Sequence, residues 1–236
     1  MCLSLVGSEM CIRDRYKNSP MSFIGSFGIG MIYGASFGLI AVFGAKLGLS
    51  IFQISILVFV NTFIGALFQY PIGKLSDTYD RRIILLILNI IALVSSICLI
   101  IFGSFSFNIL LLFVGIHSAV SLPYYAVVIS HLNDFLEKDE VVSASSTLTL
   151  VHALGLVLAP ILVSGFMSYF DAYGLFYYCT IVYLFLGLFT YQRIRIGRTS
   201  EIYDENTPTM IVPRTTSAIG MQTATEQMIS KIDEKE

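Results

Sequence analysis

The sequence predicts an all-α polytopic membrane protein with six transmembrane helices. Six long apolar stretches follow one another, and nearly every basic residue between them falls on one side of the resulting zigzag. The composition agrees, because 56% hydrophobic residues, 13% charged residues and a mean hydropathy of +0.79 are unusual for a soluble domain. These values make a soluble enzyme a poor hypothesis.

Each stretch meets the requirement of ~20 apolar residues for a helix rising ~1.5 Å per residue to cross a ~30 Å hydrocarbon core. Barrel strands need only ~10 residues and alternate polar with apolar positions, so their length excludes them. Within lipid every backbone amide must bond inside its own segment, which helices achieve. The predicted helices are Ser22–Ala45, Ile51–Ile72, Ile83–Gly103, Phe107–Ser130, Val142–Tyr169 and Ala172–Tyr191.

The formal net charge of -2 hides a strong asymmetry between the two sides of the predicted membrane protein. The far side holds only Lys46 among basic residues. By the positive-inside rule the opposite side, which carries both chain ends, is the cytoplasm. The basic residues close to the predicted helices on that side are Lys17, Lys74, Arg81, Arg82, Lys138, Arg193, Arg195 and Arg198.

The first predicted helix carries small residues at four-residue intervals, which form a smooth ridge on one face. Such a ridge lets another helix pack closely, and it also permits sliding. The fifth helix contains Gly155 and Pro160, which predict either a hinge or a fixed kink. The ridge consists of Ser26, Gly30, Gly34 and Gly38.

Polar residues are few within the stretches, and three of them, Asn61, His117 and His152, lie near mid-depth. In hydrocarbon each is costly unless it faces protein or water. His152 continues a row with Ser145 and Thr149 on one helical face, so these side chains can line a polar cavity. Their alternative role is that of hydrogen-bonded ties between helices. Further contacts to such a cavity are expected from Gln69, Ser121 and Tyr124.

The loop after the second helix has a recognisable pattern of glycine, acid and bases. Gly73 allows close backbone approach, Asp77 can accept bonds from helix-terminal amides, and Arg81 and Arg82 anchor the third helix at the headgroups. A loop built in this way can act as a conformational latch between two helix bundles. The alternative is that these charges only solvate a tight turn.

Gly-x-x-x-Asp followed by two arginines resembles the loop signature of the major facilitator superfamily of secondary transporters. The sequence departs from that signature at Thr78 and Asp80, where the family has a basic residue and glycine. Two further patterns resemble the C-terminal half of the uncharacterised YcaD-like permeases, and with the loop they cover Ile24 to Ile194. These are Pro123 with His131-x-Asn133-Asp134, and Ala144-Ser145-Ser146 with the segment from Gly155 to Pro160.

The resemblance implies one half of a twelve-span transporter of the bacterial inner membrane, which moves a small solute by alternating access. Its expected partners are the lipid bilayer, the solute with a coupling proton or cation, and a missing N-terminal half or second six-helix unit. The polar residues described above are then expected to bind the substrate, namely Asn61, Gln69, His117, Ser121, Tyr124, Thr149 and His152. No Asp or Glu lies in a predicted helix, so histidine or the missing half must supply any proton relay.

Other functional classes find less support. No cofactor, metal or catalytic site is expected, because the sequence lacks a Gly-x-Ser-x-Gly or His-Glu-x-x-His motif and a phosphate-binding glycine loop. Cys98 and Cys179 lie singly in apolar helices. The basic residues flank membrane segments, so no nucleic acid is expected. The competing hypotheses are a non-transporting assembly or regulatory module and, with less support, a polytopic membrane enzyme.

The two ends differ from the predicted bundle, residues 21–195. Residues 1–20 have too short an apolar piece for a span, and the segment Met10–Arg15 resembles the translation of a transposon end used in preparing sequencing libraries. This leader is therefore either an assembly scar before a truncated reading frame or a native cytoplasmic segment. Residues 196–236 are polar, which predicts a mostly disordered cytoplasmic tail.

Overall fold

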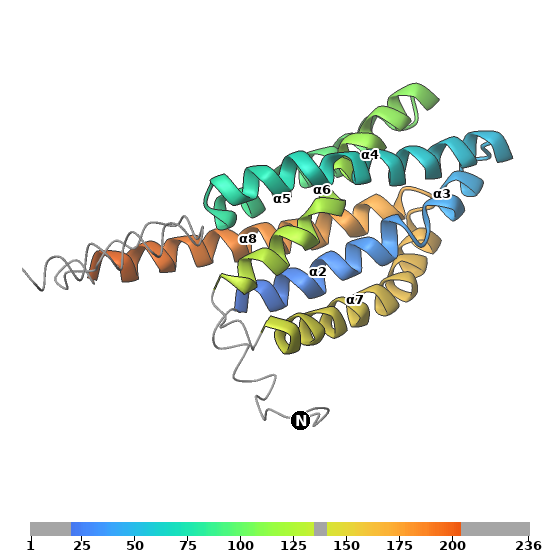
Figure 1. The fold of residues 1–236 in the computed structure, drawn as a ribbon. Coiled ribbons are helices and arrows are strands. Elements are labelled where there is room, and N and C mark those ends of the chain that lie inside the picture. Colours follow the sequence, from blue (N-terminus) through green and yellow to red (C-terminus); the bar gives the residue numbers. More distant parts are fainter. Residues whose placement is uncertain (1–19, 135–140, 204–236) are drawn as a thin grey trace, which may run out of the picture. The chain divides into compact units, whose positions relative to one another are not determined.

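The computed structural model describes residues 20–134 and 141–203, which form seven helices and no strand. The chain divides into units 1–197 and 198–236, and the helical bundle lies in the first. The leader 1–19 and the tail beyond 203 fall outside the described residues. The helices, labelled in Figure 1, are α2 (Pro20–Ser36), α3 (Ile40–Lys46), α4 (Ile51–Thr78), α5 (Arg81–Phe102), α6 (Phe107–Asn133), α7 (Val141–Tyr169) and α8 (Gly174–Tyr203).

The predicted all-α membrane architecture is confirmed. Five helices among the described residues are long and apolar enough to span a membrane, and α2 with α3 makes a sixth span if the bent pair is counted as one. The largest differences from the predicted helix ends are at the C-terminal ends of two helices. The helix α4 continues past Ile72 to Thr78, and α8 continues past Tyr191 to Tyr203.

The first span is not the continuous helix that its apolar composition predicted. Its two parts meet at an angle of 40° across residues 37–39. Two helical hydrogen bonds persist through the break, from the Phe37 amide to the Tyr33 carbonyl (2.9 Å) and from the Leu39 amide to the Ala35 carbonyl (3.0 Å). Gly38 lies within this break and Gly34 lies one turn before it, and glycine is a weak helix former because of its backbone freedom.

The helix α6 lies at the centre of the bundle, where it contacts α2, α4, α5 and α7 (Figure 1). Burial follows from this position. In the most apolar part of α6, 61% of the residues are buried, compared with 17% in the corresponding part of α4 and 28% in that of α7. The helices α4 and α7 therefore present most of their surface to whatever surrounds the bundle.

The helices α2 and α7 approach each other closely enough to exclude side chains. A Cβ atom on Gly30 would collide with the His152 carbonyl, and one on Gly34 would collide with the Leu156 carbonyl. Pro160 lacks the amide that would bond Leu156 within α7. Gly155 of α7 is packed equally closely against α2, because a Cβ atom placed on it would lie 2.9 Å from the Met31 amide nitrogen. Glycine on both helices thus permits backbone-to-backbone packing.

Only part of the ridge predicted on the first helix lies in this contact between α2 and α7, which we call the seam. Gly30 and Gly34 belong to it. Ser26 also joins this seam, because its hydroxyl donates to the Leu148 carbonyl at 2.9 Å. Gly38 does not lie in the seam. It follows the end of α2, it is exposed, and a Cβ atom placed on it would lie nearest to Gly34 of the same span. Whether the seam slides or only packs stays a prediction.

Candidate functional site

A buried polar cluster surrounds His117 inside the bundle. The side chain is only 1% exposed. Its Nε2 lies 3.1 Å from the Ser36 hydroxyl of α2, and its Nδ1 lies 3.2 Å from Ser96 and 3.5 Å from Ser95 of α5. The rings of Phe176 and Tyr183 pack against it edge-on. His117 of α6 is therefore enclosed by side chains of three other helices, α2, α5 and α8.

The serine hydroxyls fix which imidazole nitrogen carries the proton. Ser95 and Ser96 both donate to the Ala92 carbonyl, at 2.8 and 2.9 Å, so their oxygens accept from Nδ1–H of His117. Nε2 then accepts from the Ser36 hydroxyl. Both ring nitrogens are used, and the neutral imidazole satisfies every partner.

Three other predicted residues, Asn61 of α4 and Ser121 and Tyr124 of α6, extend this interior cluster. The Ser121 hydroxyl donates to the His117 carbonyl and lies 2.8 Å from the Tyr183 hydroxyl. The Asn61 amide donates to the Ser36 carbonyl at 3.3 Å. Tyr124 is buried, with Asn89 and Thr190 as polar neighbours. The structure thus brings four predicted residues together, in the core of the bundle.

A second cluster, which we call the tyrosine–histidine cluster, consists of Tyr33, Tyr125, Thr149 and His152. It joins α2, α6 and α7. The Tyr125 ring stacks on the His152 ring with centroids 4.2 Å apart and 28° between the planes. The Tyr33 ring meets His152 edge-on, at 5.1 Å and 90°. Unlike His117, these residues are partly or fully exposed.

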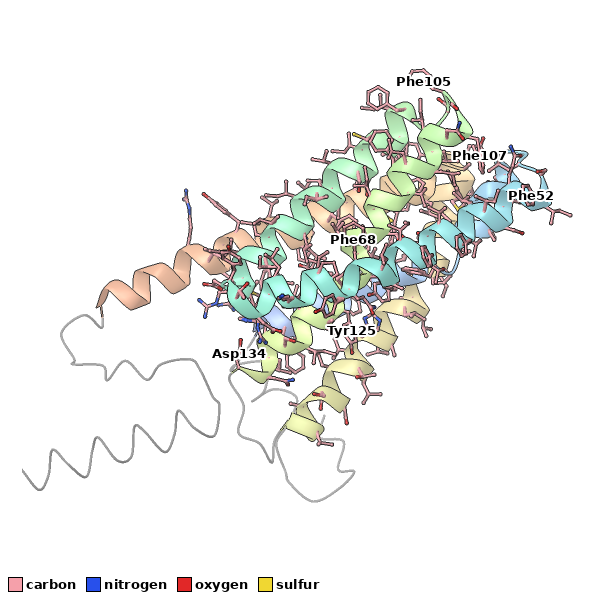
Figure 2. The ribbon with its side chains drawn as sticks, turned by 45° about the horizontal axis from the view of Figure 1, so that its top comes forward. Phe52, Phe68, Phe105, Phe107, Tyr125 and Asp134 are labelled. Carbon is pink, nitrogen blue, oxygen red and sulfur yellow. The ribbon has the colours of Figure 1, made fainter. Side chains whose placement is uncertain are left out.

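Hydrogen bonds hold the tyrosine–histidine cluster to the helix backbones. The His152 Nδ1 lies 3.3 Å from the Ser26 carbonyl, and the Tyr33 hydroxyl donates to the Leu122 carbonyl. The Tyr125 hydroxyl lies 3.2 Å from the Thr149 hydroxyl. Figure 2 shows Tyr125 between α4 and α7. The cluster is thus fixed in place while its rings remain accessible.

Sequence reasoning found Thr149 and His152 but missed both tyrosines. Tyr125 directly follows Tyr124, and consecutive residues on a helix face in different directions. A signal for Tyr33 was its position one turn beyond Gly30, on the helix that packs against α7. The remaining predicted residue, Gln69, is exposed on α4.

An ion-pair network lies at the end of the bundle that carries the predicted latch. Arg81 of α5 contacts the Asp77 carboxylate of α4 at 3.2 Å and the Asp134 carboxylate after α6 at 3.3 Å. Asp134 is labelled in Figure 2. The predicted loop is shorter than expected, because α4 extends to Thr78. The first free amide of α5 bonds to Asp80 rather than to Asp77, from Arg82 N at 2.9 Å.

Gly73 of the same predicted latch lies within α4 and borders open space. No atom of the described chain comes within 4 Å of a Cβ placed on it. The packing inside this bundle therefore gives no reason for glycine at this position. Arg82 is partly exposed at the start of α5.

Among the described residues, no three or more His, Cys, Asp or Glu side chains gather as metal ligands. Cys98 and Cys179 are free thiols. The spans therefore offer uncharged hydrogen-bonding groups and aromatic rings as their chemistry, with ion pairs at the helix ends.

Comparison with known proteins now identifies the family. The model of the Major Facilitator Superfamily matches residues 22–218, which includes every described span. The chain belongs to the major facilitator superfamily. Among curated proteins, it is 27% identical over 163 residues to the uncharacterized MFS-type transporter YfkF of Bacillus subtilis (strain 168). That match covers 68% of this chain and 41% of YfkF, so the matched part spans less than half the length of this relative.

Membership of the major facilitator superfamily confirms the resemblance carried by Gly73, Asp77, Arg81 and Arg82. It supports membrane transport in general as the function. The narrower resemblance to the YcaD-like permeases stays a prediction.

Proposed function

We propose that this protein contributes one six-helix half of a secondary transporter, which moves a small solute across the membrane by alternating access. Family membership supports transport, and the match to part of YfkF supports the assignment as a half. The second half is a missing N-terminal portion or another six-helix unit. The membrane proposed from the charge asymmetry is the bacterial inner membrane, with both chain ends cytoplasmic.

One observation carries this proposal, namely the exposed and partly polar face made by α4, α6 and α7. Ser55, Thr62 and Gln69 are exposed along α4 at seven-residue intervals, so they form one stripe. The tyrosine–histidine cluster lies on α2, α6 and α7, and Figure 2 shows its member Tyr125 between α4 and α7. Polar groups facing acyl chains are costly, whereas the same groups beside a water-filled path are solvated. We therefore assign this face to the solute path.

The interior residues take a different role in the proposal. Asn61, His117, Ser121 and Tyr124 bond to groups of this bundle, and they act as ties that hold its helices together. Of the predicted substrate-binding residues, Thr149, His152 and Gln69 remain as solute contacts.

The ion pairs of Arg81 supply the proposed latch. They connect the ends of α4, α5 and α6, so a movement of α4 relative to α6 must stretch or break them. The open space beside Gly73 leaves room for the second unit to approach α4 at this end. In this proposal the ion pairs of Arg81 with Asp77 and Asp134 favour one of the two states of alternating access, open to one side of the membrane or to the other.

The direct test is solute flux. The chain, co-produced with its second unit, is purified and screened by thermal shift against a library of small solutes. Hits are then measured by counterflow uptake in proteoliposomes. We expect at least one saturable solute, with counterflow that Arg81→Gln slows and Lys74→Gln leaves intact. Stabilising hits without counterflow in any liposome preparation would contradict transport and favour a non-transporting module.

A further inference from the structure

We propose that the tyrosine–histidine cluster binds solutes that carry an aromatic or apolar body and a protonated amine, and that it discriminates against carboxylates. This inference rests on the transport function proposed above, because it takes the face of α4, α6 and α7 as the wall of the solute path. It goes further by deriving the chemical class of the solute from the hydrogen bonds that the cluster leaves open.

Every hydrogen-bond donor of the cluster is already used. A carbonyl can only accept, so His152 donates its Nδ1–H to Ser26 at 3.3 Å. The Thr149 hydroxyl donates to the Ser145 carbonyl at 2.8 Å. It must therefore accept from the Tyr125 hydroxyl at 3.2 Å. The Tyr33 hydroxyl donates its proton to the Leu122 carbonyl.

What the cluster leaves open is acceptor capacity. With Nδ1 protonated, the neutral ring of His152 keeps a lone pair on Nε2, for which the described part of the chain offers no hydrogen-bond partner. The oxygens of Tyr33 and Tyr125 keep lone pairs as well. A solute that offers N–H or O–H groups can fill these positions, whereas a carboxylate or phosphate finds only lone pairs there.

The aromatic rings add a preference for positive charge. The face of a phenol ring attracts an ammonium group within about 6 Å by its quadrupole, an interaction estimated at ~0.5–2 kcal/mol. Tyr125 stacks on His152 with one face, and its ring remains partly exposed. The basic side chains of the described spans lie toward the ends of those spans and not in their middle, where His152 lies. They are Lys46, Lys74, Arg81, Arg82, Arg193 and Arg195. An anion therefore has no counter-charge here.

The interior cluster provides the internal contrast. His117 has the same side chain, but Ser36, Ser95 and Ser96 use both of its nitrogens. The open lone pair of His152, combined with exposed rings, is thus specific to the face of α4, α6 and α7.

The test compares three matched probes on the chain, co-produced with its second unit, in lipid nanodiscs, by saturation-transfer difference NMR. Phenethylammonium carries donors and a positive charge, its N,N,N-trimethyl derivative keeps the charge without donors, and 3-phenylpropionate carries a negative charge. We expect phenethylammonium to bind about tenfold more tightly than 3-phenylpropionate, with the trimethyl derivative between them. Empty nanodiscs give the background from partitioning into lipid.

Variants then assign the binding to the cluster. Tyr125→Leu should weaken phenethylammonium about tenfold, while Tyr177→Leu, a matched change of an exposed tyrosine on α8, should leave it unchanged. His152→Lys replaces an acceptor with a cationic donor. It should reverse the preference in favour of 3-phenylpropionate, an outcome that misfolding cannot produce.

Equal binding of the three probes, preference of the original chain for 3-phenylpropionate, or the absence of binding by any probe would overturn this proposal. So would an unchanged preference in a folded His152→Lys protein. Failure of transport is recognised separately, because amine binding without counterflow would contradict the transport function and leave the assignment of the site intact.

Discussion

The two membrane histidines, His117 and His152, occupy opposite situations in one bundle. His117 is buried among serines that use both ring nitrogens, whereas His152 is partly exposed, stacks on Tyr125 and keeps one nitrogen open. The same residue type at a similar depth thus serves as a tie in one place and, in our proposal, as a solute ligand in the other. What differs is the set of neighbouring hydroxyls, which the pattern of one helix does not reveal.

The seam that positions His152 should give the largest effect on stability. Gly30→Leu forces a side chain into the His152 carbonyl, and overpacking of this kind costs roughly 1–3 kcal/mol or more. We expect about 3 kcal/mol of lost unfolding free energy by denaturant titration in micelles. Gly73→Leu, which enters open space within α4, is the control and should not lower stability, because glycine is the weaker helix former. Equal effects of the two changes would contradict the seam.

Removing the imidazole of His117, which ties the interior cluster together, should give the second-largest loss of stability. His117→Leu leaves the hydroxyls of Ser36, Ser95 and Ser96 without their imidazole partner, and we expect a loss of about 2 kcal/mol. The preference between phenethylammonium and 3-phenylpropionate should not change, because no solute contact is lost. The same titration and binding measurements check both parts, and a changed preference would place His117 on the solute path.

The corresponding change at the open histidine should give the reverse pattern. His152→Leu removes one hydrogen bond to the Ser26 carbonyl, so we expect less than about 1 kcal/mol of lost stability. Binding of phenethylammonium should fall about tenfold. If His152→Leu costs as much stability as His117→Leu without weakening binding, the distinction between tie and ligand is wrong.

The ion pairs at the helix ends should contribute least to stability. Exposed pairs of this kind are worth about 0–1 kcal/mol, so Arg81→Gln should leave the unfolding midpoint nearly unchanged. Its expected effect is on counterflow rate, through the balance between access states. A large loss of stability would show that the network serves the fold of this bundle instead.

Much of the fold could be predicted from the sequence, because lipid imposes strict limits on segment length and backbone bonding. The spans, the all-α class and the resemblance at Gly73, Asp77, Arg81 and Arg82 followed from local patterns. The break at residues 37–39 did not, since composition and length are the same for a bent and a straight span. Gly38 within the break and Gly34 before it permit a bend without requiring one.

The candidate site was only half accessible to sequence reasoning. The depth of a residue in the membrane could be estimated from its position along a helix, and this estimate placed His117 and His152 at a similar depth. Which neighbour each meets depends on packing between helices far apart in sequence, such as α2 with α7. Tyr33 and Tyr125 were missed for this reason, since tyrosines in apolar helices usually suggest interfacial belts.

The central claim is that the face of α4, α6 and α7 borders water rather than lipid, and cysteine accessibility tests it most directly. In a chain whose four native cysteines are replaced by alanine, Thr149→Cys and Leu188→Cys are treated in intact membranes with a charged methanethiosulfonate reagent. Both positions are exposed in the isolated bundle. We predict rapid labelling at 149, slowed by phenethylammonium, and little labelling at 188 on α8. Equal labelling at the two positions, or none at 149, would contradict the account.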